Sequence, residues 1–335
     1  MNASNNVSQH EEEDGSEDIS GIPLDTIPAL VLMVFILVIN GGVILLICRH
    51  SNLRTTSNII LASLAVSDFL VGFVGIPLLV ASSSISSSSI LLSSTIFFTF
   101  ISLSTVLHIT VMTCDRYIYI MWALRYREIV NRGRVLSVLG LIWLVSLSAL
   151  VRLSWTMNFN EDTASEDMAL VIEKETAYFL FNFIVFFVTP LIVMIVLDTH
   201  MLLLLRQQCQ RIARENLPAE YVKHESKMQR RQRRIVFTCV LLLILYVIFW
   251  LPYFILDLMQ YYFTDNLEGL TPVAYAIIHY LRMCTSLFNP LAYTLRKPDL
   301  KRAVKAISYK ICPRLQSYHA ENPTEQIHLS SRTDV

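Results

Sequence analysis

The chain has 335 residues, of which 54% are apolar and only 16% are charged, and its mean hydropathy is +0.51. This balance excludes a soluble chain of this size, because so much apolar surface requires lipid as its solvent. The formal net charge is zero, but the acidic and basic residues are segregated along the chain, and their segregation predicts an orientation in the membrane.

Residues 1–27 are polar and acidic, and they lack the basic start and apolar core of a cleavable signal peptide. We expect this segment to be a disordered extracellular tail. Asn2 and Asn6 each begin an Asn-X-Ser triplet, which is an acceptor for glycosylation if this end of the chain lies outside the cell.

Seven apolar runs follow, each long enough to cross ~30 Å of hydrocarbon at 1.5 Å per residue. Backbone amides in lipid must find partners within their own segment, and the alternation typical of barrel strands is missing from the sequence, so each run should be a helix. We therefore predict an all-α membrane protein with a seven-transmembrane helix bundle over residues 28–296. The runs cover residues 28–48, 58–80, 91–121, 135–155, 176–205, 235–262 and 271–295.

The connections between the runs differ in charge. Lys and Arg gather after the first and third runs, between the fifth and sixth, and after the seventh, whereas acids gather after the fourth and sixth. The positive-inside rule then predicts an extracellular N-terminus and a cytoplasmic C-terminus at the plasma membrane. The serine-rich segment 82–94 should be a flexible solvated loop. Segment 207–234 most simply carries solvated charge next to the membrane, with partner binding as the alternative.

Residues 297–312 have the pattern of a short amphipathic eighth helix lying on the inner leaflet, where it would contact membrane lipids. Cys312 beside it is a candidate for palmitoylation, and residues 313–335 should form a cytoplasmic tail. The six cysteines fall in the runs or on the predicted cytoplasmic side, and their spacing is not that of a metal site. We therefore expect reduced thiols and no exofacial disulfide.

Asp68 lies in the middle of the second run, where an unpaired carboxylate is costly, and it is the strongest functional candidate from physical chemistry alone. The alternative is a structural carboxyl group that is protonated or satisfied by hydroxyls, with Asn40 and Asn289 as further partners. Four prolines within the runs should kink their helices and permit pivoting, and Trp250 stands beside one of these kinks. The prolines are Pro77, Pro190, Pro252 and Pro290.

Polar side chains also occur near the outer ends of the runs. If they converge, they form a cavity for a ligand that bears charge or hydrogen-bonding groups. Each of them is about as readily explained by a structural pair, such as Asp257 with Arg282. His108, deep in the third run, is expected to be a satisfied structural histidine rather than a pH sensor. The candidate ligand-binding set near the outer ends is Arg152, Asn182, Asp257, Gln260, His279 and Arg282.

One recognisable group of residues stands in each run, and together they occur in a fixed order. They are Asn40 with Val43, Leu64 with Asp68, Asp115-Arg116-Tyr117, Trp143, Pro190, Phe249-Trp250-Leu251-Pro252 and Asn289-Pro290-Leu291-Ala292-Tyr293. With this series the chain resembles the rhodopsin-like (class A) G-protein-coupled receptors across nearly its whole ordered length.

The resemblance implies a receptor that passes an extracellular signal to a heterotrimeric G protein, and not an enzyme. It implies that Arg116 contacts a Gα subunit when the sixth helix swings outward, with Asp115 holding Arg116 at rest and Tyr293 stabilising the open form. It also implies that Trp250 couples the ligand to this swing. No cofactor is implied beyond an allosteric sodium ion, whose pocket would comprise Asp68, Thr105, Thr285, Ser286 and Asn289.

The sequence departs from the family pattern at several places. Leu91 stands where the family usually has the cysteine that ties the third helix to the second outer loop, and that loop has no cysteine. Asp198 replaces a tyrosine of the fifth helix, and Gln232 replaces an acid that often pairs with the arginine. We infer that the contacts that hold the arginine in the resting state, called here the resting lock, are weakened. As a hypothesis, the receptor then signals without a ligand.

The ligand class stays open at this point. Phe98 occupies the place of the amine-binding aspartate and Met283 that of the retinal-binding lysine, so the resemblance disfavours amine and light receptors. Arg282 and Arg152 would suit an anionic ligand, whereas the acidic outer loops would attract a cationic peptide. A chemosensory, odorant-like receptor is a further alternative. A transporter is less favoured, because we see no internal duplication.

Overall fold

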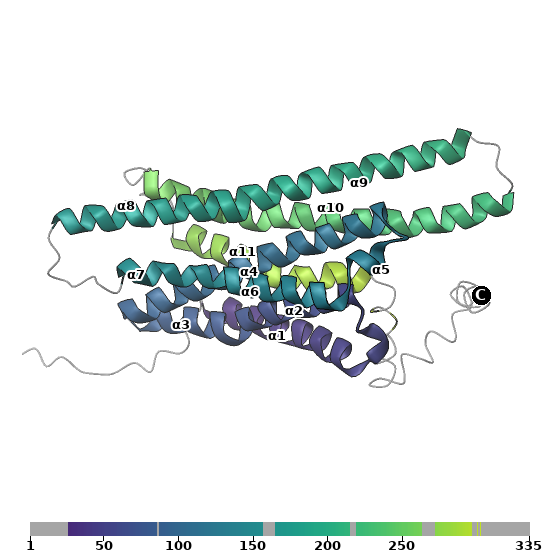
Figure 1. The fold of residues 1–335 in the computed structure, drawn as a ribbon. Coiled ribbons are helices and arrows are strands. Elements are labelled where there is room, and N and C mark those ends of the chain that lie inside the picture. The colour runs from purple at the N-terminus through teal and green to yellow at the C-terminus, as the bar shows by residue number, and fades with distance from the viewer. Residues whose placement is uncertain are drawn as a thin grey trace, which may run out of the picture.

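The computed structural model describes residues 26–85, 87–156, 165–214, 219–262, 272–296, 300 and 302. All regular structure within these ranges is helical, and the long helices lie side by side in a bundle (Figure 1). The predicted all-α bundle is therefore confirmed. The predicted tail over residues 1–25, the eighth helix apart from Leu300 and Arg302, and the C-terminal tail lie outside the described residues.

The helices follow the predicted runs closely. Six continuous stretches in the described part are long and apolar enough to cross a membrane: residues 26–49, 56–84, 88–121, 132–152, 170–212 and 228–256. α11 completes the bundle and packs against α10, α1 and α2. The elements are α1 Thr26–Arg49, η1 Ser51–Leu53, α2 Thr56–Leu70, η2 Val71–Gly75, α3 Ile76–Ser84, α4 Ser88–Met121, α5 Tyr126–Ile129, α6 Arg132–Ser146, η3 Leu147–Arg152, α7 Leu153–Thr156, α8 Ser165–Asn182, η4 Phe183–Val188, α9 Thr189–Arg214, α10 Ala219–Tyr262 and α11 Pro272–Arg296.

Two of the four prolines act through wide helical turns. The π-helical segments η2 and η4 lie directly before Pro77 and Pro190, because a proline has no amide hydrogen and its ring displaces the carbonyl four residues earlier. For Pro190 this carbonyl belongs to Phe186, and it accepts a hydrogen bond from the Tyr246 hydroxyl at 3.3 Å. α10 and α11 remain continuous through Pro252 and Pro290.

The serine-rich segment is mostly helix, so the prediction of a flexible loop over residues 82–94 is wrong. α3 continues to Ser84 and α4 begins at Ser88, after a Ser87 residue with extended backbone. Serine hydroxyls satisfy backbone carbonyls within the same helix, as in Ser82 to Leu79 at 2.7 Å and Ser93 to Ser89 at 2.7 Å. Low complexity misled the prediction, because serine can hydrogen-bond to its own helix as well as to solvent.

The bundle is apolar outside as well as inside. Large apolar side chains are buried between α1, α2, α4, α6, α9, α10 and α11, with Leu64, Met112 and Leu242 in the largest cluster. Others point outward, such as Leu45 at 66% and Leu144 at 65% exposed. An apolar outer surface is what lipid requires, because the bilayer core has no water to solvate polar groups.

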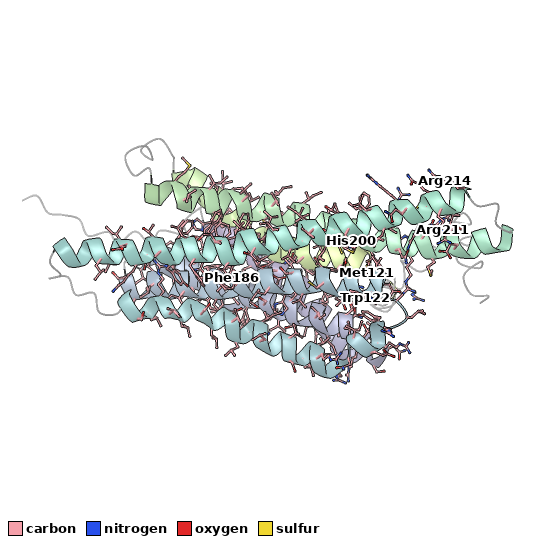
Figure 2. The ribbon with its side chains drawn as sticks, turned by 45° about the horizontal axis from the view of Figure 1, so that its top comes forward. Met121, Trp122, Phe186, His200, Arg211 and Arg214 are labelled. Atoms are coloured by element: carbon pink, nitrogen blue, oxygen red, sulfur yellow. The ribbon has the colours of Figure 1, made fainter. Side chains whose placement is uncertain are left out.

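The basic segment between the fifth and sixth runs forms the ends of two long helices. α9 and α10 both extend past the rest of the bundle (Figure 1). Arg211 and Arg214 lie at the far end of α9, well beyond Met121 and Trp122 at the end of α4 (Figure 2). Five cysteines fall in the described part and all are free thiols, whereas Cys312 lies outside it.

Candidate functional site

The end of α4 carries a guanidinium group that is held by three neighbouring elements. Arg116 is 15% exposed, and its Nε lies 3.8 Å from the carboxylate of Asp115. Its terminal nitrogen donates a hydrogen bond to the hydroxyl of Ser57 in α2. The other carboxylate oxygen of Asp115 accepts a hydrogen bond of 2.6 Å from the hydroxyl of Tyr126 in α5. The Arg116 charge is thus covered in this conformation by α2, α4 and α5 together.

Tyr126 also interacts with the Thr56 side chain at the start of α2. Burial and the nearby Asp115 carboxylate raise the pKa of Tyr126 above its ordinary value, since both oppose its ionisation. Tyr126 therefore acts as a neutral hydrogen-bond donor. Tyr117 turns to the opposite side of α4, where its hydroxyl lies 2.8 Å from the His200 Nδ1 in α9.

A second buried polar group lies on α9, and within the described residues it has no hydrogen-bond partner. Asp198 is 2% exposed, and neither of its carboxylate oxygens has a hydrogen-bond partner among the described residues. The Tyr293 hydroxyl is also without a partner there, and the charges of Arg116 and Asp198 both act on it. Comparison with the family pattern identified the Asp198 substitution, but only the structure shows that the carboxyl group is unpartnered.

The middle of the bundle holds the residues predicted for a sodium pocket, and α2, α4 and α11 bring them together. Asp68 is fully buried, and the Asn289 amide donates to its Oδ2 at 3.4 Å. The Asp68 Oδ1 and the Thr285 hydroxyl have no hydrogen-bond partner in the described part, and the Ser67 and Thr105 hydroxyls are 3.3 Å apart. Unpartnered carboxylate and hydroxyl oxygens are the donors that a hard cation prefers, so this set fits a sodium ion.

His108 is a satisfied structural histidine, as the sequence predicted. Its Nε2 lies 2.8 Å from the Ser63 hydroxyl and its Nδ1 lies 2.7 Å from the Ser104 carbonyl oxygen. The Trp143 indole donates to the same Ser63 hydroxyl at 3.1 Å. His108, Ser63 and Trp143 therefore join α4, α2 and α6.

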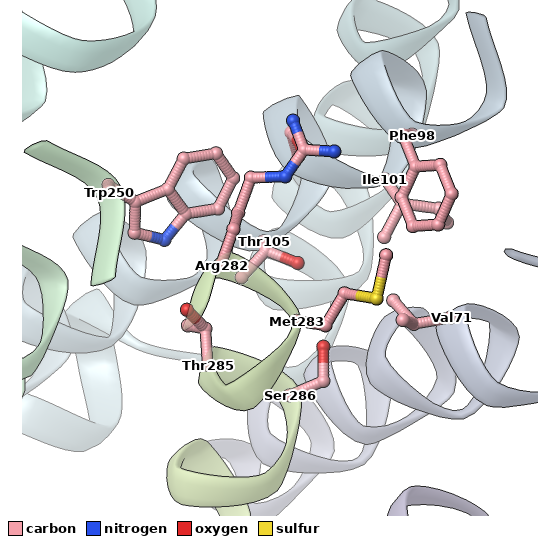
Figure 3. Close-up of a pocket in the computed structure, with 10 residues that line it drawn as sticks. Val71, Phe98, Ile101, Thr105, Trp250, Arg282, Met283, Thr285 and Ser286 are labelled. Carbon is pink, nitrogen blue, oxygen red and sulfur yellow. The ribbon is translucent and has the colours of Figure 1, made fainter. Parts of the chain in front are cut away.

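On the other side of the Asp68 group, towards the predicted outer face, the bundle contains a small cavity of about 20 Å³. Phe98, Trp250 and Arg282 line it together with hydroxyls from Thr105, Thr285 and Ser286. Figure 3 shows the Arg282 guanidinium between the Trp250 and Phe98 rings, with these three hydroxyl-bearing residues nearer the middle of the bundle. The cavity thus shares Thr105, Thr285 and Ser286 with the predicted sodium pocket.

Arg282 is 8% exposed and is stacked on aromatic rings rather than paired with an acid in the described part. Its guanidinium carbon lies 4.0 Å from the ring centroid of Tyr253 and 5.3 Å from that of Phe98. Trp250 is 3% exposed, and its ring packs against those of Tyr246 and Phe254, with both centroid separations 6.2 Å.

Of the other predicted ligand-binding residues, two are engaged elsewhere. Arg152 forms a two-point ion pair with Glu175 of α8, with N to O distances of 2.9 and 3.0 Å. Asn182 donates at 2.8 Å to the Tyr178 carbonyl within its own helix. The His279 ring contacts Tyr253 with a centroid separation of 5.6 Å. The side chains of Asp257 and Gln260 lie outside the described residues.

Four residues of the site could not be identified from the sequence. Ser57, Tyr126, Tyr246 and Tyr253 are common residue types in ordinary helical surroundings, and their roles depend on neighbours in other helices. For Tyr246 one signal did exist, because Pro190 must leave a carbonyl without its helical partner. The residue that would reach this carbonyl was not predictable.

Comparison with known proteins supports the arrangement described above. The family described as 7 transmembrane receptor (rhodopsin family) matches residues 39–293. Melanocortin receptor 5 of Bos taurus is 28% identical over 272 residues, covering 78% of this chain and 77% of that receptor. Histamine H2 receptor of Cavia porcellus is 22% identical over 317 residues, with 91% and 84% covered. Melatonin receptor type 1A of Mus musculus is 23% identical over 299 residues, with 84% and 80% covered.

Proposed function

This chain belongs to the rhodopsin family of seven-transmembrane receptors, and from that premise we propose that Arg116 is the residue its G protein engages. The protein is a multi-pass receptor of the cell surface that signals through G proteins, and it is not an enzyme. The observation that supports the proposal is the cover over Arg116, which is only 15% exposed. A movement of α5 or of the inner end of α10 would expose it to a partner.

The resting lock consists of contacts from α2, α4 and α5. Asp115 and Ser57 hold the guanidinium, and Tyr126 holds Asp115. In the described part no acid of α10 pairs with Arg116, and Gln232 stands where the family often has one. An exposed ion pair between α10 and Arg116 would contribute ~0.2–1 kcal/mol to holding α10 in place. We infer that α10 is held less firmly than in such relatives and that the receptor has ligand-free basal activity.

A bound ligand would influence the cytoplasmic end of the bundle through Trp250. This residue lines the cavity and packs against Tyr246 and Phe254. Pro252 lies two residues further on and allows α10 to pivot. In α11, Asn289 and Pro290 connect the Asp68 group to Tyr293. A bistable bundle of this kind responds to any ligand that binds one of its two states more tightly.

A sodium ion would be held by Asp68 with hydroxyls from Thr105, Thr285 and Ser286, and Asn289 would orient the carboxylate. The ion would supply one positive charge to balance the buried carboxylate. The unpartnered Asp68 Oδ1 supports this site. The expected effect is a stabilised resting state, because the ion ties together α2, α4 and α11.

Nucleotide exchange on a purified G protein, with the full chain in lipid nanodiscs, tests the role of Arg116. Arg116→Ala should abolish the exchange that the receptor stimulates. Arg206→Ala is the matched control, since Arg206 is an exposed cation of α9 near the same end of the bundle. Equal exchange by the Arg116→Ala variant and the wild-type protein would refute the proposal.

The remaining proposals concern the termini. An extracellular N-terminus would carry glycans at Asn2 and Asn6, and a cytoplasmic C-terminus would carry a palmitoyl group at Cys312 beside an eighth helix on membrane lipids. Epitope tags at both ends of the chain in intact and permeabilised cells test this orientation. Two tags accessible from the same side of the membrane would contradict it.

A further inference from the structure

Arg282 places a positive charge in the interior of the bundle that no acid among the described residues balances. The side chain is 8% exposed, and a charge at such a position is costly unless an opposite charge or hydrogen bonds compensate it. Within the described residues, Arg116 pairs with Asp115 and Arg152 pairs with Glu175, and Arg282 belongs to neither ion pair. The Tyr253 and Phe98 rings attract the guanidinium, but aromatic faces offset only part of the cost of removing it from water.

The two arginines that the sequence offered as ligand anchors are therefore not equivalent. Both oxygens of the Glu175 carboxylate contact Arg152, in the two-point geometry that satisfies a guanidinium well. Arg282 has aromatic rings in place of a carboxylate and lines the cavity itself. Of these two arginines, Arg282 is the one that has no carboxylate partner among the described residues and could pair with a ligand's charge.

The walls of the cavity define the rest of the ligand. Val71, Phe98, Ile101, Trp250 and Met283 give it largely apolar sides. As the side chains stand, the cavity has a volume of about 20 Å³, which is room for about one water molecule and far below the ~300–1,000 Å³ that is typical of sites for drug-sized ligands. A ligand here must therefore be small, and the side chains around Trp250 and Phe98 must move apart to admit its apolar body, while the Arg282 charge repels a cationic group.

We propose that this cavity binds a small amphiphilic carboxylic acid, whose carboxylate pairs with Arg282 and whose apolar body packs against Trp250 and Phe98. The inference rests on the receptor function proposed above and adds the chemical class of its ligand. It selects the anionic alternative over the cationic peptide that the acidic outer loops would attract. The apolar body contacts Trp250, so binding acts on the residue through which α10 would respond.

The test uses the full chain in lipid nanodiscs and measures thermal unfolding with a panel of carboxylates. The panel comprises butyrate, octanoate, phenylacetate, 4-phenylbutyrate and indole-3-acetate, each paired with its neutral amide. At least one acid should raise the Tm of the wild-type protein more than its amide does. If no acid exceeds its amide, the proposal is overturned.

Two variants assign the effect to the arginine. Arg282→Gln should bind the active acid roughly tenfold to hundredfold more weakly, because a charged hydrogen-bonded pair is lost. Arg152→Gln is the matched control and should retain the affinity. Equal affinity in Arg282→Gln and the wild-type protein overturns the proposal. Without ligand, Arg282→Gln should melt no lower than the wild-type protein, whereas a purely structural arginine predicts a lower Tm.

Two further experiments test whether an inorganic anion or an acidic side chain of the protein neutralises Arg282 instead. If chloride in place of gluconate gives the full stabilisation and the acids add nothing, the cavity is an inorganic-anion site and the proposal fails. If Asp257→Asn binds the acid and the wild-type protein does not, the charge is neutralised within the protein, and the proposal fails too. Nucleotide-exchange assays with Arg116→Ala are run in parallel. The thermal-unfolding assay tests the ligand inference and the exchange assay tests G-protein coupling, so failure of one can be told from failure of the other.

Discussion

Replacing Tyr126 by Phe removes one hydroxyl from the resting lock and leaves the ring in place. This hydroxyl donates at 2.6 Å to the carboxylate that holds Arg116. Hydrogen bonds to charged groups contribute ~1.5–3 kcal/mol, and we take the lower end because Tyr126 is only partly buried. If the bond exists only in the resting state, its loss favours the open state by about 1.5 kcal/mol, which is roughly tenfold. An open state populated at about 1% would rise to about 10%.

The measurement is ligand-free nucleotide exchange on a purified G protein at matched receptor amounts in nanodiscs. Tyr119→Phe is the matched control, because Tyr119 contacts the Tyr126 ring at a centroid separation of 5.3 Å and its hydroxyl makes no contact with Asp115. We expect a roughly tenfold rise in basal exchange for Tyr126→Phe and little change for the control. An unchanged rate for Tyr126→Phe would refute the idea that this bond distinguishes the two states.

The pH dependence of the Tyr126 contribution follows from its pKa. Because the folded-state pKa is raised above that of the unfolded chain, the neutral hydroxyl stabilises the resting state at any pH below the ordinary tyrosine value of about 10. This stabilisation is lost only as the pH rises above that value. The ratio of basal exchange between Tyr126→Phe and the wild-type protein should therefore be the same at about pH 6.5 and about pH 8.5, both of which lie below the ordinary tyrosine pKa.

Three further predictions address other buried polar groups. Tyr246→Phe should lower the unfolding free energy by about 1 kcal/mol, seen as a lower Tm, because the Phe186 carbonyl that Pro190 displaces loses its partner; an unchanged Tm would contradict this role. Asp198→Val should raise the Tm, because an apolar side chain replaces a buried carboxyl group that has no hydrogen-bond partner among the described residues and costs about 1–3 kcal/mol, and a marked drop in Tm would contradict this. Sodium added in place of potassium should raise the Tm of the wild-type protein but not that of Asp68→Asn, and an equal response from both would exclude Asp68 from the site.

Much of the architecture follows from the sequence, because lipid permits few solutions. Seven apolar runs of spanning length must be helices, and the ordered motifs from Asn40 to Tyr293 indicated the family before any contact was known. The burial of Asp68 and its contact with Asn289 were also predictable, since polar residues within a span must face the interior, whereas Thr105, Thr285 and Ser286 were implied by the family resemblance. The serine-rich segment was mispredicted, because serines within a helix and in a loop have the same composition.

Tertiary structure alone decided which polar groups meet. Arg152 and Arg282 are equivalent in the sequence, yet Arg152 faces Glu175 and Arg282 faces two aromatic rings and a cavity. The sequence also did not identify the hydrogen-bond partner of Asp115. The structure shows that it is Tyr126 of α5. Hydropathy fixes which segments cross the membrane, but helix rotation and the turns at η2 and η4 set the directions of individual side chains. Those directions depend on packing between helices far apart in the chain.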